Sequence, residues 1–253
     1  RPRAVVQAGG QDLLALRYQN ESRRDNEAQF VLDVTGKFNT VGVDHTMLVG
    51  TDIIVQDTKF ERFRQNLATP VVIQDNPTIN FTPPANQPKQ VVLADTRWVS
   101  LYAQDQLSML ANGRLKALIG GRFDMVHTER SANGVSSPTL DDKAVTGRGG
   151  LLYKLTDEYS VYGSVAQSFL PQLADVVDVN GDPLSPEKGI QYEVGAKASL
   201  FDDTLSATLS IYQIEKSDVA VFDNDLFIST GQIAYFPGVE ERSRGFEIDV
   251  TGS

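Results

Sequence analysis

The stretch KGIQYEVGAKASLFDDTLSATLSIYQ, residues 188–213, alternates apolar and polar residues on both sides of a short acidic segment. Even positions from Ile190 to Leu200 are aliphatic, aromatic or alanine, and so are odd positions from Leu205 to Ile211. Side chains of a β-strand point to opposite faces in turn, so this pattern predicts two amphipathic strands. The residues FDD, 201–203, tolerate tight turns and predict a hairpin between the strands.

The same alternation recurs along the chain, whereas helical periodicity is almost absent. It predicts ten strands, at residues 11–20, 28–37, 41–58, 92–110, 114–131, 143–155, 159–168, 188–200, 204–220 and 240–251. Short connectors alternate with long polar ones: the short ones are 36–39 (GKFN), 111–113, 156–158 and 201–203, and the long ones lie near 21–27, 59–91, 132–142, 169–187 and 221–239. In an up-and-down antiparallel meander, this places all short turns at one end of the sheet and all long loops at the other.

Composition excludes several classes of protein. Lys and Arg total 23 against 33 Asp and Glu, and a net charge of -10 argues against a nucleic-acid partner. The absence of cysteine excludes disulfides, thiolate metal sites and a cysteine nucleophile. No apolar run approaches the roughly 18 residues of a transmembrane helix. The N-terminus has no positively charged start followed by an apolar run, so no signal peptide is predicted. We expect the chain to be a mature or excised piece.

The apolar face of these strands could be buried in a soluble sandwich or could contact lipid in a transmembrane barrel with a polar lumen. Several predicted strands exceed the five or six residues usual in globular sheets and match the roughly 9–11 residues of a tilted membrane-spanning strand. Medium-sized aliphatic residues and alanine dominate this face, so we favour the all-β, antiparallel transmembrane barrel. The aromatic residues beside the short turns fit an interfacial girdle or ordinary cross-strand packing; they are Phe38, Tyr153, Tyr159 and Phe201.

Five segments in order carry a family resemblance: YAQDQL (102–107), KALIGGRFD (116–124), TGRGGLLYKLTDEYSVYGSVAQSF (146–169), SPEKGIQYEVGAKA (185–198) and ERSRGFEIDVTG (241–252). Together they resemble the barrel of TonB-dependent siderophore receptors, with the ferrichrome-receptor group most similar. The resemblance implies a plugged barrel of about 22 strands. Residues 1–253 would then be the middle section of that single barrel domain. The N-terminal plug with its TonB-binding box and the final strands would be absent from this chain.

The resemblance also implies a function: import of a ferric siderophore, with a ferrichrome-like hydroxamate favoured, across the outer membrane of a Gram-negative bacterium. Its expected partners are the siderophore, TonB through the plug, and outer-membrane lipid and lipopolysaccharide. Iron would be cargo, and neither a cofactor nor enzymatic activity is expected. The alternatives are another cargo on the same fold (cobalamin, a glycan or another metal chelate), a soluble all-β binding module, and a barrel enzyme.

The barrel interpretation assigns side chains to two faces. The residues predicted to line the lumen are Gln191, Glu193, Lys197, Arg122, Asp124, Glu247 and Asp249. Those predicted to face lipid are Ile190, Tyr192, Val194, Leu205, Leu209 and Ile211. Paired carboxylates on the polar face could serve acid–base catalysis, but in a wide barrel we expect them to pair across strands or with the plug.

Connector 59–91 is long, and long loops are disproportionately binding elements. It contains arginine and aromatic side chains that suit an iron chelate with an anionic, oxygen-rich core. The predicted ligand-binding residues are Phe60, Arg62, Phe63, Arg64 and Phe81. A solvated outer cover without a binding role is the alternative.

The remaining motifs predict no catalytic or metal chemistry. His45 and His127 are the only histidines, too few for a multi-histidine metal site and distant in sequence. DVNGDP (178–183) faintly resembles a calcium loop, but Val176 occupies the position of the first carboxylate, so an Asx-type turn is predicted. Gly120–Gly121 and Gly149–Gly150 do not open helices and predict strand curvature or close approach.

Overall fold

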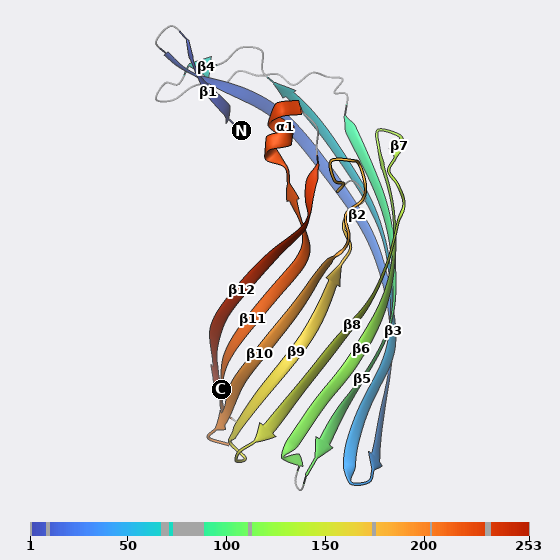
Figure 1. Cartoon of the computed structure of the whole chain (residues 1–253), viewed down its shortest axis with the longest axis vertical. Helices are drawn as coiled ribbons and strands as arrows, with labels where there is room; N and C mark the ends of the chain where they lie inside the picture. The colour runs from blue at the N-terminus through green and yellow to red at the C-terminus, as the bar shows by residue number, and fades with distance from the viewer. Residues whose placement is uncertain are drawn as a thin grey trace. The chain divides into compact units, whose positions relative to one another are not determined.

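A computed structural model describes residues 2–8, 11–66, 71–72, 89–110, 113–173, 176–202, 204–230 and 234–252. The strands follow one another in the sheet order β1-β2-β3-β5-β6-β8-β9-β10-β11-β12, while β4 pairs with β2 and β7 pairs with β6 (Figure 1). This is the predicted antiparallel up-and-down meander. The elements are β1 (Pro2–Ala8), β2 (Gln11–Thr40), β3 (Val43–Asn66), β4 (Val71–Val72), β5 (Gln90–Met109), β6 (Leu115–Ala132), β7 (Val135–Ser136), β8 (Leu140–Lys154), β9 (Tyr159–Leu170), β10 (Glu187–Leu200), β11 (Leu205–Phe222), α1 (Asn224–Thr230) and β12 (Tyr235–Gly252).

The chain divides into two compact units. Unit one comprises Arg1–Glu27, Gln56–Asp95 and Arg130–Ser137, and unit two comprises Ala28–Val55, Thr96–Glu129 and Pro138–Ser253. Unit two contains the turns that join β2 to β3, β8 to β9 and β10 to β11, and they lie together at one end of its strands (Figure 1). Unit one contains the other ends of β2, β3, β5 and β6.

The hairpin of β10 and β11 forms as the opening stretch predicts. Its pairing runs without a shift from Lys188 opposite Ser217 to Leu200 opposite Leu205. Phe201 and Asp202 both have positive φ, 54° and 55°, as a tight hairpin turn that follows the strand twist requires. The alternation of residue types and the turn chemistry therefore agree on one register.

Two of the predicted connectors are wrong, because their residues belong to a β-strand. Residues 21–27 lie inside β2, and GKFN (36–39) lies near its end; the chain reverses instead at Val41 and Gly42, with φ of 51° and 82°. The polar residues of 21–27 remain in a strand because their side chains meet partners on β3: Thr58 donates a hydrogen bond to Asp25 at 2.7 Å. Asn39 explains the true turn, since its Oδ1 accepts the N–H of Gly42 at 3.2 Å.

Two other connectors contain local structure. The predicted Asx-type turn at 178–183 is confirmed, since Asp178 Oδ1 accepts the N–H groups of Asn180 at 2.8 Å and Asp182 at 2.9 Å. The Asp182 N–H, followed by the Asn180 groups, holds the pKa of the Asp178 carboxyl below its ordinary value. The connector at 221–239 contains α1, which the period-two pattern did not predict; Asp223 caps it by accepting the N–H of Leu226 at 2.9 Å.

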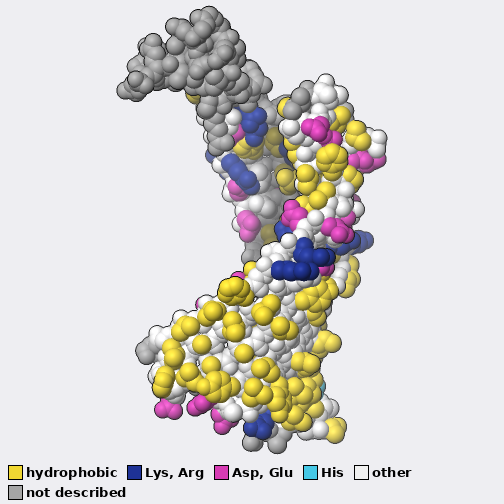
Figure 2. Space-filling model, turned by 60° about the vertical axis from the view of Figure 1, so that its left-hand side comes forward, with side chains coloured by type: hydrophobic (Ala, Val, Ile, Leu, Met, Phe, Trp, Pro, Cys, Tyr) yellow, Lys and Arg dark blue, Asp and Glu magenta, His cyan; other side chains and the backbone are white. Residues whose placement is uncertain are grey.

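Few large apolar side chains are buried, and many are exposed. Among the described residues the buried hydrophobic ones are Phe63, Val92, Val126, Leu184 and Ala234. Many of the exposed ones in unit two gather on one face of it (Figure 2). The described strands form one sheet, with no second sheet stacked on it, so the sandwich alternative is not what this part of the chain adopts. No helix in the described ranges is long and apolar enough to cross a bilayer.

Candidate functional site

The register of unit two sorts the predicted facing residues into two sets. Directly opposed residues of antiparallel strands share a face, and the strand pairings from β6 to β12 carry this parity across the unit. One face, called the polar face, holds all seven residues predicted to line a lumen: Arg122, Asp124, Gln191, Glu193, Lys197, Glu247 and Asp249. The other, called the apolar face, holds all six predicted to contact lipid: Ile190, Tyr192, Val194, Leu205, Leu209 and Ile211. Which face meets lipid stays a prediction.

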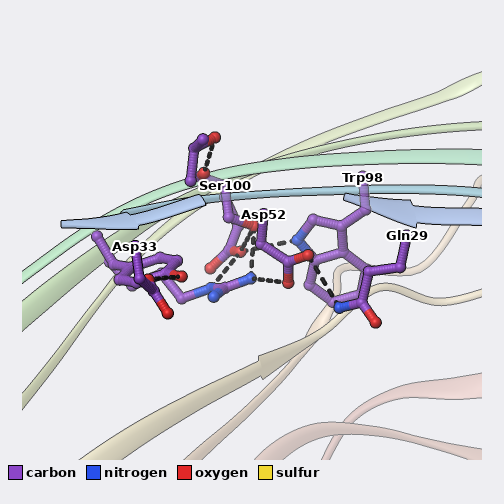
Figure 3. A network of polar contacts seen from close by, with 9 residues as sticks. Gln29, Asp33, Asp52, Trp98 and Ser100 are labelled. Carbon is purple, nitrogen blue, oxygen red and sulfur yellow. Dashed lines mark hydrogen bonds and ion pairs between the residues drawn. The ribbon is translucent and has the colours of Figure 1, made fainter. Parts of the chain in front are cut away.

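Arg122 is the centre of a hydrogen-bonded network on the polar face. Figure 3 shows this network, with Asp52, Trp98 and Ser100 among the labelled residues. Its Nε donates to Asp124 Oδ1 at 2.7 Å, and one terminal nitrogen donates to Ser100 Oγ at 2.5 Å. The same terminal nitrogen lies 3.5 Å from Asp52 Oδ2. The guanidinium carbon also lies 5.4 Å from the ring centroid of Tyr102. The planar guanidinium thus joins β3, β5 and β6, a use that lysine geometry would not allow.

Asp124 is the buried acceptor of this network. It receives hydrogen bonds from Trp98 Nε1 at 2.7 Å and from Ser100 Oγ at 2.6 Å, in addition to that from Arg122. Ser100 is completely buried and Asp124 is only 3% exposed. A carboxylate buried to this extent is stable because its donors replace the lost water.

Residues from β2 extend the network. Gln29 Nε2 donates to Asp52 Oδ1 at 3.0 Å, and Tyr102 donates its hydroxyl proton to Asp33 Oδ1 at 2.6 Å. Sequence reasoning identified Arg122 and Asp124 but missed these partners, which come from strands far away along the chain. The sequence marks each of these partners only as one polar residue in an alternating strand pattern, which does not show which residues it contacts.

Tyrosines of the polar face lie across glycines of neighbouring strands. A Cβ on Gly195 would be 2.6 Å from the ring of Tyr162, which lies directly opposite. A Cβ on Gly245 would be 2.7 Å from the ring of Tyr212 and 2.5 Å from its hydroxyl oxygen. The Tyr162 hydroxyl then reaches Glu193, and Lys197 Nζ lies 5.3 Å from the Tyr162 ring. The glycines supply the space that lets each ring lie flat over the next strand.

The two histidines lie apart, and each pairs with a carboxylate. His45 Nδ1 lies 2.6 Å from Asp105 Oδ2, and its ring stacks on Phe38 with centroids 4.6 Å apart. His127 Nδ1 lies 2.7 Å from Asp141 Oδ1. Within the described ranges, no group of three or more histidine and carboxylate side chains has the arrangement of a metal site.

The apolar face carries basic residues toward the loop ends of its strands. The register places there the exposed side chains of four residues from three strands: Lys143 of β8, Lys188 of β10, and Arg242 and Arg244 of β12. Arg242 Nε lies 3.0 Å from Glu215 Oε1, and Arg244 donates to Gln213. A hollow of about 710 Å³ is lined by Lys143, Lys188 and Arg242 among others. Figure 2 shows lysine and arginine side chains beside the hydrophobic field.

In unit one, four of the five predicted ligand-binding residues belong to strand β3 and not to a loop. Phe63 is 5% exposed, and its ring lies 6.0 Å from that of Tyr18, so it packs inside the unit. Phe60, Arg62 and Arg64 lie at alternate positions on one face. Phe81 lies outside the described residues.

The arginines of this face meet partners from β2. Arg62 Nε lies 2.6 Å from Glu21 Oε1, and the Arg62 guanidinium carbon lies 4.7 Å from the Phe60 ring centroid. Arg64 Nε donates to Gln19 Oε1 at 3.0 Å. We call Glu21, Phe60, Arg62 and Arg64 the arginine cluster. It offers cations and an aromatic ring on one open surface.

The whole pattern of strands and faces agrees with comparison to known proteins. Residues 3–253 match the family model described as TonB dependent receptor-like, beta-barrel. The chain belongs to this family. Proteins of the TonB-dependent receptor-like barrel family lie in the outer membrane of Gram-negative bacteria, so the predicted family, fold class and location are confirmed.

Curated relatives of this family member include receptors and a transporter. The chain is 29% identical over 254 residues to the "Ferrichrome outer membrane transporter/phage receptor" of Escherichia coli (strain K12), covering 97% of this chain and 32% of that protein. It is 28% identical to the "Metal-pseudopaline receptor CntO" of Pseudomonas aeruginosa (strain UCBPP-PA14), covering 93% of this chain and 33% of that protein. The chain therefore spans about a third of the length of the curated relatives it matches.

Solved structures of barrel receptors share the fold of this family member. The ferripyoverdine receptor of the outer membrane of Pseudomonas aeruginosa, bound to ferripyoverdine, superposes with a TM-score of 0.77 at 22% identity, covering 100% of this chain and 33% of that chain. The siderophore receptor PiuA from Acinetobacter baumannii gives 0.76 at 19% identity, covering 95% and 37%.

Proposed function

We propose that this chain is a wall section of an outer-membrane receptor that imports ferric siderophores, with ferrichrome-like hydroxamates as the favoured cargo. One observation carries the proposal: a single sheet has one polar, hydrogen-bonded face and one exposed apolar face. A barrel wall between lipid and a wet lumen requires that arrangement. Family membership and the similarity to a ferrichrome transporter supply the cargo class.

In this proposal the polar face lines the lumen. The Arg122 network links four strands, β2, β3, β5 and β6, and its proposed role is to hold them in register. TonB delivers energy through a plug that is not part of this chain. Cargo is carried and released unchanged.

The arginine cluster is the proposed contact for cargo in this section. A ferric chelate has an oxygen-rich metal core and flat or apolar arms. Guanidinium groups bind oxygen acceptors with fixed geometry, and an aromatic ring such as Phe60 contacts apolar arms. Phe63 has no part in this contact because it is buried against Tyr18.

The apolar face is the proposed lipid contact. Its exposed aliphatic and aromatic side chains match hydrocarbon, and the basic residues near the loop ends match phosphate groups of lipopolysaccharide. In the receptor family long loops point out of the cell, which puts these cations at the outer leaflet. Along the strands, the apolar residues would therefore lie at the level of the lipid hydrocarbon, and the basic residues at the level of the phosphate groups.

Uptake of labelled ferric chelates by cells carrying the full-length receptor tests the proposal. The host should lack its own siderophore receptors, and a matched strain should also lack TonB. We expect uptake of ferric trihydroxamate that disappears without TonB. Uptake of labelled cobalamin or of a glycan, with no uptake of any ferric chelate, would show that the receptor imports the alternative cargo.

A further inference from the structure

Glu21 occupies the position between the two arginines of the cluster. Its Oε1 lies 2.6 Å from Arg62 Nε and 4.0 Å from a terminal nitrogen of Arg64. The three side chains remain accessible: Glu21 is 36% exposed, Arg62 28% and Arg64 44%. Glu21 belongs to a segment that sequence reasoning had assigned to a connector, so it was not among the predicted site residues.

The carboxylate changes what a ligand meets at this surface. Two guanidinium groups and one carboxylate leave a formal charge of one positive unit, whereas the arginines alone would present two. One edge of Arg62 is already paired with Glu21, and its plane lies near Phe60. An approaching anion therefore meets a partly neutralised arginine and a repelling carboxylate.

We infer that Glu21 sets the charge selectivity of the arginine cluster, disfavouring multiply anionic ferric chelates relative to neutral ones. The inference rests on the proposed function. Three hydroxamates neutralise Fe³⁺, so a ferric trihydroxamate carries no net charge, whereas three doubly charged catecholates leave a trianion. Repulsion by Glu21 acts on the trianion and not on the neutral complex. Discrimination of this kind combines attraction of the chosen ligand with rejection of its competitor.

Unit one supplies a matched control carboxylate. Glu61 on β3 pairs with Lys59 at 2.9 Å and Lys89 at 2.8 Å. It also accepts a hydrogen bond from Ser22, the neighbour of Glu21 on β2, and successive strand residues point to opposite faces. Glu61→Gln therefore removes the same charge from the same unit without altering the arginine cluster.

The experiment measures equilibrium binding to the full-length receptor in detergent, with a neutral ferric trihydroxamate and a trianionic ferric tris-catecholate as probes. Glu21→Gln should strengthen tris-catecholate binding about threefold or more at low salt, because one opposing charge is lost within a Debye length. Trihydroxamate binding should change less than about twofold, and the difference between probes should shrink as salt rises. Glu21→Asp, which keeps the charge, and Glu61→Gln should behave like the wild type.

Equal effects of Glu21→Gln on both probes, or an equal effect of Glu61→Gln, would overturn the inference. The inference would also be overturned if the Glu21→Gln variant bound both probes with the same affinities as the wild type. A heat-induced shift in electrophoretic mobility shows that each variant has a folded barrel. If the wild type binds neither probe, the proposed function itself fails, an outcome distinct from binding that ignores Glu21.

Discussion

At the scale of single residues, glycine and tyrosine act as pairs across neighbouring strands. Tyr162 lies flat because Gly195 has no Cβ; an added methyl would lie 2.6 Å from both the Tyr162 ring and the Leu209 carbonyl oxygen. Gly36 on β2 has no atom within 4 Å of the corresponding position. Gly195 is therefore required by the packing of the Tyr162 ring, whereas Gly36 has room for a side chain.

We expect Gly195→Ala to destabilise the full-length barrel by about 1–3 kcal/mol, since either the ring or the strand must move. Gly36→Ala should be neutral or slightly stabilising, because alanine restricts the unfolded chain. Urea titration of the receptor folded in lipid vesicles measures both. Equal stability of the two variants would show that the ring adapts without cost.

Protonation of Asp178 should change the local stability of the turn that it forms at residues 178–183. The N–H groups of its own turn lower its pKa in the folded state, so the charged carboxylate contributes stability above the ordinary value of about 3.9. That contribution is lost as the pH falls through the lower, folded pKa. Hydrogen-exchange protection of peptides covering 176–184, corrected for intrinsic rates, should therefore fall at the acid end. Asp178→Asn, which cannot titrate, should remove the dependence; its persistence would assign the effect to another group.

At the scale of elements, β11 presents different surroundings at adjacent positions. Leu209 is 50% exposed on the apolar face, and Thr208 lies opposite Lys197 and Asp249 on the polar face. An arginine at position 209 would enter hydrocarbon if this face meets lipid, while one at 208 would enter a hydrated, charged surface.

Leu209→Arg in the full-length receptor should cost about 2–4 kcal/mol if the site is near the bilayer midplane. Thr208→Arg should be much milder. Folding titrations into lipid vesicles compare the two variants directly. Similar losses for both would contradict the assignment of the apolar face to lipid.

The elements also show where local sequence rules succeed. The β10–β11 hairpin was predictable because alternation and turn chemistry coincide there. The turn at Val41 and Gly42 was not, because a β-branched residue rarely adopts positive φ and Asn39 with Gly36 offered a more usual turn sequence. Strand 11–40 was divided in two because polar residues suggest a loop when their cross-strand partners are unknown.

At the scale of the whole molecule, β1 and β12 are the two ends of the sheet order. The unpaired edges of a section of barrel expose backbone donors and acceptors that template association with other strands. Within a bilayer these groups would also lack hydrogen-bond partners. Neighbouring strands of a longer protein would satisfy both edges.

Residues 1–253 expressed alone should therefore aggregate or require refolding with the rest of the barrel. Size-exclusion chromatography without detergent, followed by thermal unfolding, measures this. A monodisperse monomer with a cooperative melt would contradict this prediction and show that the section folds without the rest of the barrel.

The fold class and the division into two faces were predictable for this molecule because both depend on a two-residue period. The partners within the site were not predictable. Arg122 and Asp52 are 70 residues apart, and only the sheet brings them together. Phe63 shows the same limit, since its burial against Tyr18 depends on a strand that the local sequence presents as loop.

The Arg122 network has a consequence for how the wall is assembled. Its donors and acceptors come from four strands, and a slip of one residue in any of them would turn that strand's side chain to the opposite face. A slip of β5 against β6 would separate Asp124 from the Trp98 and Ser100 donors, and a slip of β3 would separate Asp52 from Arg122 and Gln29. Misalignment of β3, β5 and β6 would therefore cost several hydrogen bonds at once, so the network favours the observed strand register over one shifted by a residue.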